Sequence, residues 1–184
     1  NLASNALAVC QAVRPPDDEV RLSILPLSHI YGRTCDLYCW LARGTRLALA
    51  ESRETIFRDC QLVRPTALNA VPYFYRKVVH RLLEEHDEVD GALLRQALGG
   101  DIKRCYCGGA ALAPEVDAFY RQRGLPVCCG YGLTETAPVI SASSVHNDQA
   151  GAVGPPIPTT EVRLGEDGEI LVRGPGVMAG YWQK

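Results

Sequence analysis

The sequence lacks any apolar run that is long enough to cross a membrane. Its longest apolar stretches, such as Leu47–Ala50 and Ala67–Pro72, fall far short of the ~20 residues that a spanning helix needs. We also expect no secretory signal peptide, because the residues from Asn1 onward are mixed polar sequence. The sequence therefore predicts a protein without a transmembrane segment.

A marked excess of charge of either sign is also missing. The 184 residues carry 19 Lys and Arg against 21 Asp and Glu, which gives a formal net charge of −2. A nucleic-acid-binding domain usually has a basic excess, so we expect no nucleic acid partner. Apolar residues make up 47% of the chain and charged residues 22%, which indicates an ordinary globular domain and excludes a disordered segment.

Paired cysteines of the metal-binding type are absent, although the chain has eight cysteines. None of them forms a Cys-x-x-Cys pair; they stand at Cys10, Cys35, Cys39, Cys60, Cys105, Cys107, Cys128 and Cys129. We interpret them as reduced core residues, which predicts a cytoplasmic location. The alternative is a zinc site, in which scattered thiols would have to meet one of the four histidines, His29, His80, His86 or His146.

Short apolar runs alternate with segments of helical period from Val20 onward, which is the pattern of parallel strands joined by crossover helices. The expected strands are Arg21–Leu25, Arg46–Ala50, Ala67–Val71, Ile102–Cys107 and Pro126–Cys129. The expected helices are Tyr31–Ala42, Glu54–Val63, Phe74–Glu85, a segment around Leu93–Leu98 that Gly99 and Gly100 end, and one that begins at Pro114. The predicted fold class is therefore α/β, a mostly parallel sheet with flanking helices.

The character of the sequence changes near Ser141. Residues 141–158 are rich in Ser, Asn, Gly and Pro, which is typical of a loop. Beyond them, Glu161–Leu164 and Glu169–Arg173 flank the turn Gly165–Gly168, which predicts a β-hairpin. We expect an α/β subdomain over residues 1–140, followed by a linker and a partial β-rich subdomain over residues 141–184.

Unusual sequence follows three of the expected strands at the point where each one ends. The first strand leads into Pro26–Gly32, the fourth into Gly108–Leu112, and the fifth into Gly130–Thr136. Because the carboxyl ends of parallel strands meet at one edge of a sheet, these segments predict a shared binding crevice. Each segment also has a plain structural explanation, since Gly-Gly can be a tight turn and a lone histidine a packing residue.

The third segment has the most specific chemistry. Gly130 and Gly132 allow close approach of a ligand to the backbone, and Tyr131 offers a flat face for a base. Thr134 offers a hydroxyl to phosphate, and Glu135 a hard oxygen ligand for Mg²⁺. The competing interpretation makes Glu135 a helix cap or the partner of an arginine. The sequence has no G-x-x-x-x-G-K-[ST] motif, which disfavours a P-loop NTPase. The G-x-G at Gly130 and Gly132 lacks the third glycine of the dinucleotide-binding motif, which disfavours a dinucleotide-dependent dehydrogenase.

Taken together, these motifs resemble the adenylate-forming superfamily, and most closely its long-chain fatty acyl-CoA synthetase branch. The segments that carry the resemblance are Asn1-Leu2 with Asn5, Leu25–Gly32, Arg64–Pro72, Gly108–Leu112, Tyr131–Glu135 and Gly168–Trp182. The resemblance implies that the chain is an internal piece of an N-terminal domain and ends in the start of a small β-barrel subdomain. It also implies a ligase that joins a carboxylate and ATP into an acyl adenylate and then transfers the acyl group to coenzyme A.

Site roles follow from the resemblance. Glu135 would hold Mg²⁺, Thr134 would contact the α-phosphate, and His29 would lie beside the reacting carboxylate. The other nucleotide-binding residues that it implies are Gly108, Gly109, Ala110, Ala111, Gly130, Tyr131, Gly132 and Leu133. The acyl wall would consist of His29, Tyr31, Val71, Pro72 and Tyr73.

Other interpretations remain open at this point. The acid could be an aryl, short-chain or amino acid, or the domain could bind nucleotide or acyl groups without catalysis. Compared with the family pattern, the chain lacks the phosphate loop upstream and the ribose-binding segment and C-terminal domain downstream. We therefore expect the isolated piece to be inactive, with exposed strand edges that can pair two copies into a homodimer.

Overall fold

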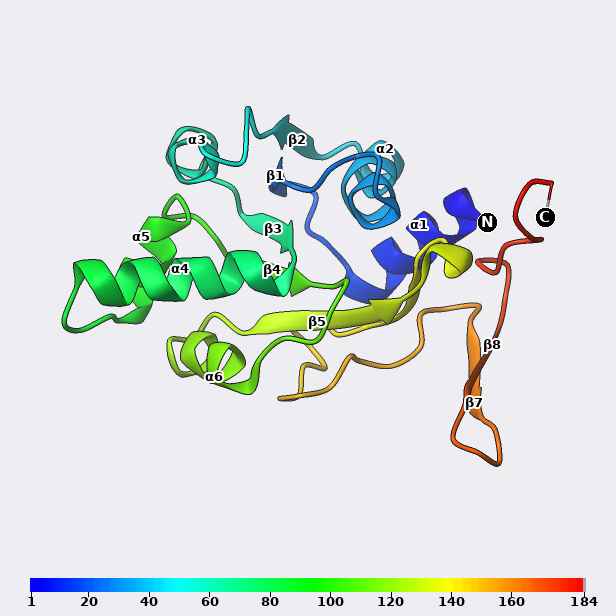
Figure 1. The fold of residues 1–184 in the computed structure, drawn as a ribbon. Helices are drawn as coiled ribbons and strands as arrows, with labels where there is room; N and C mark the ends of the chain where they lie inside the picture. Colours follow the sequence, from blue (N-terminus) through cyan, green and yellow to red (C-terminus); the bar gives the residue numbers. More distant parts are fainter. Residues whose placement is uncertain (184) are drawn as a thin grey trace.

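The computed structural model describes residues 1–183, and most of them form a six-stranded sheet with helices on both faces (Figure 1). The strand order is β2-β1-β3-β4-β5-β6. The strands are β1 (Val20–Ser23), β2 (Arg46–Leu49), β3 (Ala67–Ala70), β4 (Arg104–Cys107), β5 (Val127–Gly132) and β6 (Val139–Ala142). Neighbours among β1 to β5 pair in parallel, whereas β6 pairs antiparallel with β5. The predicted α/β class with a mostly parallel sheet is confirmed.

Helices α3 to α6 lie on one side of the sheet, and α1, η1 and α2 lie on the other (Figure 1). Their bounds are α1 (Leu2–Val13), η1 (Gly32–Tyr38), α2 (Cys39–Arg43), α3 (Ile56–Val63), α4 (Pro72–Glu85), α5 (Gly91–Ala97) and α6 (Pro114–Gln122). Pro72 and Pro114 occupy first-turn positions, where a missing N–H costs nothing. The side chain of Asp90 accepts a hydrogen bond from Leu93 N–H at 2.8 Å and caps α5.

The two faces of the sheet differ in chemistry because successive side chains of a strand point to opposite sides. Leu22, Leu68 and Val127 point toward α3 to α6 and lie in the large apolar cluster. On the opposite face, Arg21 and Asn69 are buried beneath η1 and α2. The face of the sheet that α1, η1 and α2 cover is therefore partly polar, and Arg21 and Asn69 line a cavity there.

Several elements differ from the sequence expectations. Helix α1 was not expected, and the segment predicted as one helix over Tyr31–Ala42 is a π-helix, η1, continued by α2. Strand β5 runs to Gly132, so Gly130–Gly132 are strand residues and not a loop. Strand β6 extends to Ala142, into the stretch expected as a loop from Ser141, because its backbone pairs with the second half of β5.

The expected hairpin is confirmed as β7 (Glu161–Leu164) and β8 (Ile170–Arg173), which extend away from the large sheet (Figure 1). After β8 the chain returns to the large sheet, where Met178 N–H donates a hydrogen bond to Glu135 O at 2.8 Å. Within residues 1–183, no helix combines the length and the apolar character that a membrane crossing requires.

Candidate active site

A cavity of about 310 Å³ opens at the carboxyl ends of the parallel strands and continues beneath α1, η1 and α2. Its wall includes residues from all three segments that follow the strands, among them His29 after β1, Gly108 after β4 and Glu135 after β5. These residues are far apart in the sequence, and the parallel sheet brings them together because the ends of its strands share one edge.

The structure brings most of the sequence-predicted site residues to this cavity. Those that line it are His29, Tyr31, Gly108, Gly109, Gly130, Tyr131, Gly132, Leu133, Thr134 and Glu135. Ala110 and Ala111 are exposed and are not part of the wall, and neither are Val71, Pro72 and Tyr73. Val71 instead borders the Gly109 loop, since a Cβ added to Gly109 would meet its Cγ1 at 3.7 Å.

A short 3₁₀ turn, Thr134–Thr136, carries the hydroxyl and the carboxylate that the sequence predicts to contact phosphate and Mg²⁺. Leu133 N–H donates to Pro138 O at 2.9 Å, and Thr136 Oγ1 donates to the same oxygen at 2.6 Å. Gly132 lets Pro138 come this close, because a Cβ added to Gly132 would lie 1.9 Å from Pro138 O. The turn is thus held by two hydrogen bonds to the Pro138 carbonyl oxygen. Thr134 and Glu135 lie at the cavity wall.

The carboxylate of Glu135 has a phenol as its partner. Tyr181 Oη donates to Glu135 Oε1 at 2.7 Å, and this hydrogen bond, with one from the Glu135 backbone N–H, lowers the pKa of the carboxyl below its usual range. The carboxylate is therefore ionised at neutral pH. The described ion pairs of the chain do not include Glu135, so the arginine-partner interpretation does not describe this structure.

The donor set at Glu135 fits a magnesium ion that is shared with a nucleotide. Residues 1–183 contain no group of three or more His, Cys, Asp or Glu side chains that could hold a metal by themselves. Mg²⁺ does not need such a group, because it usually takes one or two carboxylates and fills its remaining positions with phosphate oxygens and water. A single ionised, half-exposed carboxylate beside Thr134 meets that requirement.

His29 is held in one tautomer by its own turn. Its Nδ1 accepts a hydrogen bond from Tyr31 N–H at 3.2 Å, and its backbone N–H donates to Pro26 O at 3.0 Å. A neutral imidazole that accepts at Nδ1 carries its proton at Nε2. His29, which lines the cavity, therefore has an N–H donor at Nε2, a group that suits an oxygen anion.

Tyr31 forms the wall between the first and second segments. A Cβ added to Gly108 would lie 3.2 Å from Cζ of Tyr31, so a larger residue here would push the ring away by a few tenths of an ångström. The Tyr31 hydroxyl donates to Tyr106 O at 3.3 Å, and burial raises its pKa well above the usual value. The ring is therefore a neutral, fixed surface at the centre of the cavity.

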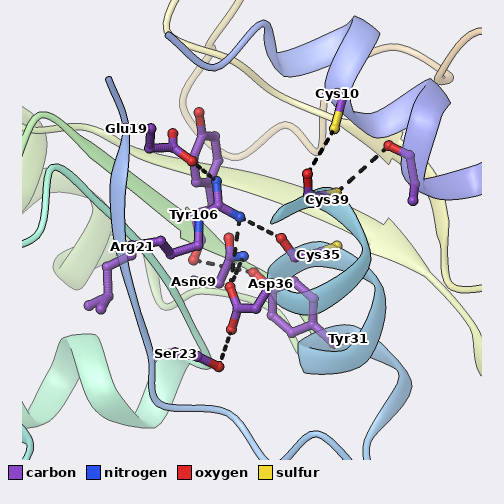
Figure 2. A network of polar contacts seen from close by, with 12 residues as sticks. Cys10, Glu19, Arg21, Ser23, Tyr31, Cys35, Asp36, Cys39, Asn69 and Tyr106 are labelled. Carbon is purple, nitrogen blue, oxygen red and sulfur yellow. Dashed lines mark hydrogen bonds and ion pairs between the residues drawn. The ribbon is translucent and has the colours of Figure 1, made fainter. Parts of the chain in front are cut away.

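The inner part of the cavity contains a buried charge network that sequence reasoning missed (Figure 2). Arg21 contacts Glu19 Oε1 at 2.6 Å, Asp36 Oδ1 at 3.7 Å and Cys35 O at 2.5 Å. Asp36 also accepts hydrogen bonds from Ser23 Oγ at 2.7 Å and Asn69 Nδ2 at 2.6 Å.

Burial and pairing act in opposite directions on these groups. Burial raises the pKa of the Asp36 carboxyl, while Arg21 and the two hydrogen bonds lower it. Burial alone would lower the pKa of Arg21, but Glu19 and Asp36 raise it. The one sequence signal for this network was an arginine inside an apolar strand, facing an aspartate in a segment expected to be helical.

Comparison with known proteins shows the family to which the chain belongs. The sequence profile of the family described as AMP-binding enzyme matches residues 1–182. This chain belongs to the AMP-binding enzyme family. A curated member, the long-chain-fatty-acid–CoA ligase of Escherichia coli O157:H7, is 29% identical over 184 residues, covering 92% of this chain and 31% of that protein. The long-chain-fatty-acid–CoA ligase FadD15 of Mycobacterium bovis is 43% identical over 90 residues, 49% of this chain and 15% of that protein.

Solved structures of similar proteins match nearly the whole chain. A malonyl-CoA ligase with bound methylmalonyl-CoA and AMP superposes with a TM-score of 0.81 at 28% identity, covering 99% of this chain and 40% of that one. Wild-type E. coli MenE with a bound analogue of OSB-AMS superposes with a TM-score of 0.74 at 28% identity, covering 98% and 36%. The chain thus spans well under half the length of these relatives.

Proposed function

We propose that the full-length protein containing this chain is an ATP-dependent fatty acid–CoA ligase that acts in the cytoplasm. The observation that carries the proposal is the shared cavity, where His29, Thr134 and Glu135 meet glycine-rich backbone from two strand ends. Curated relatives named long-chain-fatty-acid–CoA ligase support a fatty acid as the acid. Because the chain covers only part of those proteins, the activity is assigned to the full-length protein and not to the isolated piece.

The first step joins the acid to the nucleotide. A carboxylate oxygen forms a bond to the α-phosphorus of ATP, the bond to the bridging oxygen breaks, and pyrophosphate leaves with the electron pair. Both reactants are anions, so the reaction depends on alignment and on neutralisation of charge. His29 Nε2–H donates to the acid, Thr134 Oγ1 donates to the α-phosphate, and the Gly108–Gly109 backbone borders the base.

Mg²⁺ held by Glu135 supplies positive charge against the phosphate oxygens when it is bound. The chain's contribution is a carboxylate whose pKa is lowered by the hydrogen bond from Tyr181, so that it stays ionised to more acidic pH. In the second step the thiol of coenzyme A loses its proton to solvent and its sulfur bonds to the acyl carbon; the acyl–oxygen bond breaks, and AMP leaves with the electron pair. His29 remains placed to donate to the oxygen anion that forms on the acyl group.

A second candidate function has the same reaction but a different acid as the substrate. Solved structures similar to this chain include a malonyl-CoA ligase and MenE. This similarity favours a short or aromatic acid as the alternative substrate. The size of the acid that gives the highest kcat/KM separates the two candidates.

The experiment measures pyrophosphate release by the full-length protein with ATP, Mg²⁺ and one acid at a time. Fatty acids of increasing length are compared with benzoate, malonate and amino acids. We expect release that depends on a fatty acid, and a loss of about 10²-fold or more in Glu135→Gln, because one charge-stabilising group is removed. Glu115→Gln, at the exposed start of α6, is the matched control and should keep the wild-type rate.

Two outcomes contradict the proposal. Binding of ATP without pyrophosphate release with any acid would indicate a nucleotide-binding module. An equal loss in Glu135→Gln and Glu115→Gln would show that the position of the Glu135 carboxylate has no special role.

A further inference from the structure

We propose that Cys107 and Cys129 are a reversible oxidation site: a peroxide joins them in a disulfide, and this disulfide weakens nucleotide binding at the neighbouring candidate site. The nucleotide part of the inference rests on the proposed function. The disulfide itself does not, because it follows from the places of two thiols in the sheet. All eight cysteines of the chain are free thiols in this structure.

The sheet places these two cysteines side by side. Strands β4 and β5 carry two cysteines each, and their parallel register pairs Cys107 with Cys129. Paired residues of neighbouring strands lie roughly 4.8 Å apart, which is inside the range of about 4.4–6.8 Å between the Cα atoms of a disulfide. Both side chains point to the face that α3 to α6 cover, since Cys107 belongs to the apolar cluster there and Cys129 packs against it.

The other two cysteines of these strands lie beside residues of other types. Cys105 is paired with Val127, and Cys128 is paired with Tyr106. Cys128 also belongs to the cluster on the opposite face of the sheet. The register therefore selects one thiol pair from the four cysteines, and it leaves Cys105 and Cys128 as matched controls.

The contact between the two thiols makes one of them the better nucleophile. Cys107 donates a hydrogen bond to the sulfur of Cys129, and this bond lowers the pKa of Cys129 below the ordinary value of a thiol. The same contact, together with burial, raises the pKa of Cys107. Because the thiolate is the reactive form, Cys129 is the sulfur that attacks an oxidant.

Access to the oxidant favours the same cysteine. Cys129 is half-buried and lines the cavity, whereas the other seven cysteines are buried. Cys10 and Cys39 form a second close pair, with Cys10 Sγ 3.9 Å from Cys39 O, but both are buried. Cys129 is therefore the cysteine most open to a molecule as small as hydrogen peroxide.

The reaction has two steps. The Cys129 thiolate attacks one oxygen of hydrogen peroxide, the O–O bond breaks, and hydroxide leaves, so that Cys129 becomes a sulfenic acid. The Cys107 thiol then gives up its proton, its sulfur bonds to the sulfur of Cys129, and the S–O bond breaks as a second hydroxide leaves. The two thiols lose two electrons and two protons in total, and the peroxide is reduced to two water molecules.

The disulfide changes the nucleotide site because each cysteine precedes one of its glycines. Gly108 follows Cys107 and Gly130 follows Cys129, and both glycines line the cavity. A disulfide brings the two sulfurs to about 2.0 Å from each other, much closer than a hydrogen-bond contact. The ends of the two strands therefore shift, and the backbone that borders the base shifts with them. A thiol that reduces the bond restores the original position.

The first measurement detects the bond itself. The full-length protein is treated with hydrogen peroxide, the remaining thiols are blocked, and its tryptic peptides are analysed by mass spectrometry without reduction. We expect peptides 105–121 and 124–163 to be linked, and dithiothreitol to separate them.

Single alanine variants identify the two sulfurs, because each of these peptides contains two cysteines. Cys107→Ala and Cys129→Ala should each abolish the linked pair. Cys105→Ala and Cys128→Ala are the matched controls on the same strands and should keep it. Cys129→Ala changes a half-buried position, so it also tests the pair without opening a cavity in the buried core.

The second measurement follows ATP affinity by titration calorimetry before and after treatment with peroxide. We expect the oxidised wild type to bind ATP about tenfold more weakly, as the loss of one or two hydrogen bonds to the nucleotide would produce. Dithiothreitol should restore the affinity. In Cys129→Ala the affinity should be the same with and without peroxide.

Three outcomes would overturn the inference. They are the absence of the linked peptides, a link that persists in Cys107→Ala and Cys129→Ala, and equal ATP affinities of the reduced and the disulfide-linked protein. If the reduced protein releases pyrophosphate and no link forms, the proposed function stands and this inference fails. If the link forms and weakens ATP binding in a protein that releases no pyrophosphate with any acid, the inference stands and the proposed function fails.

Discussion

Asn5 and Val139 form a two-way amide pair between α1 and β6. Asn5 Nδ2 donates to Val139 O at 2.8 Å, and Val139 N–H donates to Asn5 Oδ1 at 3.1 Å. The same Nδ2 also donates to Thr136 O at 3.2 Å. A single buried side chain thus joins the first helix to the turn that holds Glu135, which explains how α1 supports the site without lining its phosphate end.

Replacing Asn5 with alanine should destabilise the protein by about 1–3 kcal/mol, because backbone groups of Val139 and Thr136 would lose buried partners. Urea unfolding of the full-length protein measures the change. Gln11→Ala, at an exposed position of the same helix, is the control and should shift the free energy of unfolding by no more than about 0.5 kcal/mol. Equal effects of the two variants would contradict the role given to Asn5.

Gly132→Ala should be much more harmful than Gly130→Ala. A Cβ at Gly132 would lie 1.9 Å from Pro138 O, whereas one at Gly130 would lie 3.2 Å from Ser141 O. Overpacking of this kind costs about 1–3 kcal/mol or more, and the backbone of the Glu135 turn has to move to relieve it. Thermal unfolding and ATP binding, measured on both variants, test the ranking; wild-type ATP affinity in Gly132→Ala would refute it.

The helices with clear periodicity could be predicted from the sequence, and so could the edge of the sheet where the site lies. In α4 the apolar residues recur on one helical face, and Pro72 begins the helix at a position where proline is favoured. The strand ends were recognisable because glycine and polar residues follow short apolar runs. These are local features of the sequence. They predict the place of the candidate site because parallel strands bring their carboxyl ends to one edge of the sheet.

Features that depend on distant partners could not be predicted in this way. Strand β6 has four residues, and its strand conformation comes from pairing with β5. The hydrogen bond between Glu135 and Tyr181 joins residues 46 positions apart. Arg21 and Asp36 each look like an isolated charge in an apolar segment, and only the packing of η1 on β1 turns them into a pair. No periodicity marks such contacts.

Arg21→Met should destabilise the protein by about 3–5 kcal/mol at neutral pH, because it leaves the buried carboxylates of Glu19 and Asp36 without their cation. Burial already raises the pKa of Asp36, and Arg21 opposes this rise. Without Arg21 the pKa rises further, so Asp36 takes up a proton as the pH falls and its uncompensated charge disappears. The loss of stability should therefore shrink toward acidic pH.

Urea unfolding of Arg21→Met over a range of pH values measures this dependence. Adding Asp36→Leu should restore part of the stability and weaken its pH dependence, because the buried acid is then absent. A loss that is constant with pH would show that Asp36 does not bear the uncompensated charge.

Tyr181→Phe should raise the pKa of Glu135 toward its ordinary value, because the hydroxyl that donates to the carboxylate is the main cause of the lowered pKa. A carboxylate with a lowered pKa stays charged to more acidic pH, so the variant should lose its charge at a higher pH than the wild type does. The pH below which the ATP- and Mg²⁺-dependent activity falls should also be higher in the variant. At alkaline pH the carboxylate is ionised in both proteins, and the difference should disappear.

Carbon NMR titration of the Glu135 carboxyl group measures the shift directly and needs no catalytic turnover. Tyr73→Phe is the matched control, since Tyr73 is an exposed phenol on α4 that does not line the cavity. Its removal should leave the Glu135 titration unmoved. If Tyr181→Phe also leaves that titration unmoved, the Tyr181 hydroxyl does not hold the carboxylate in solution, and the charge of Glu135 depends on its backbone N–H and on solvent alone.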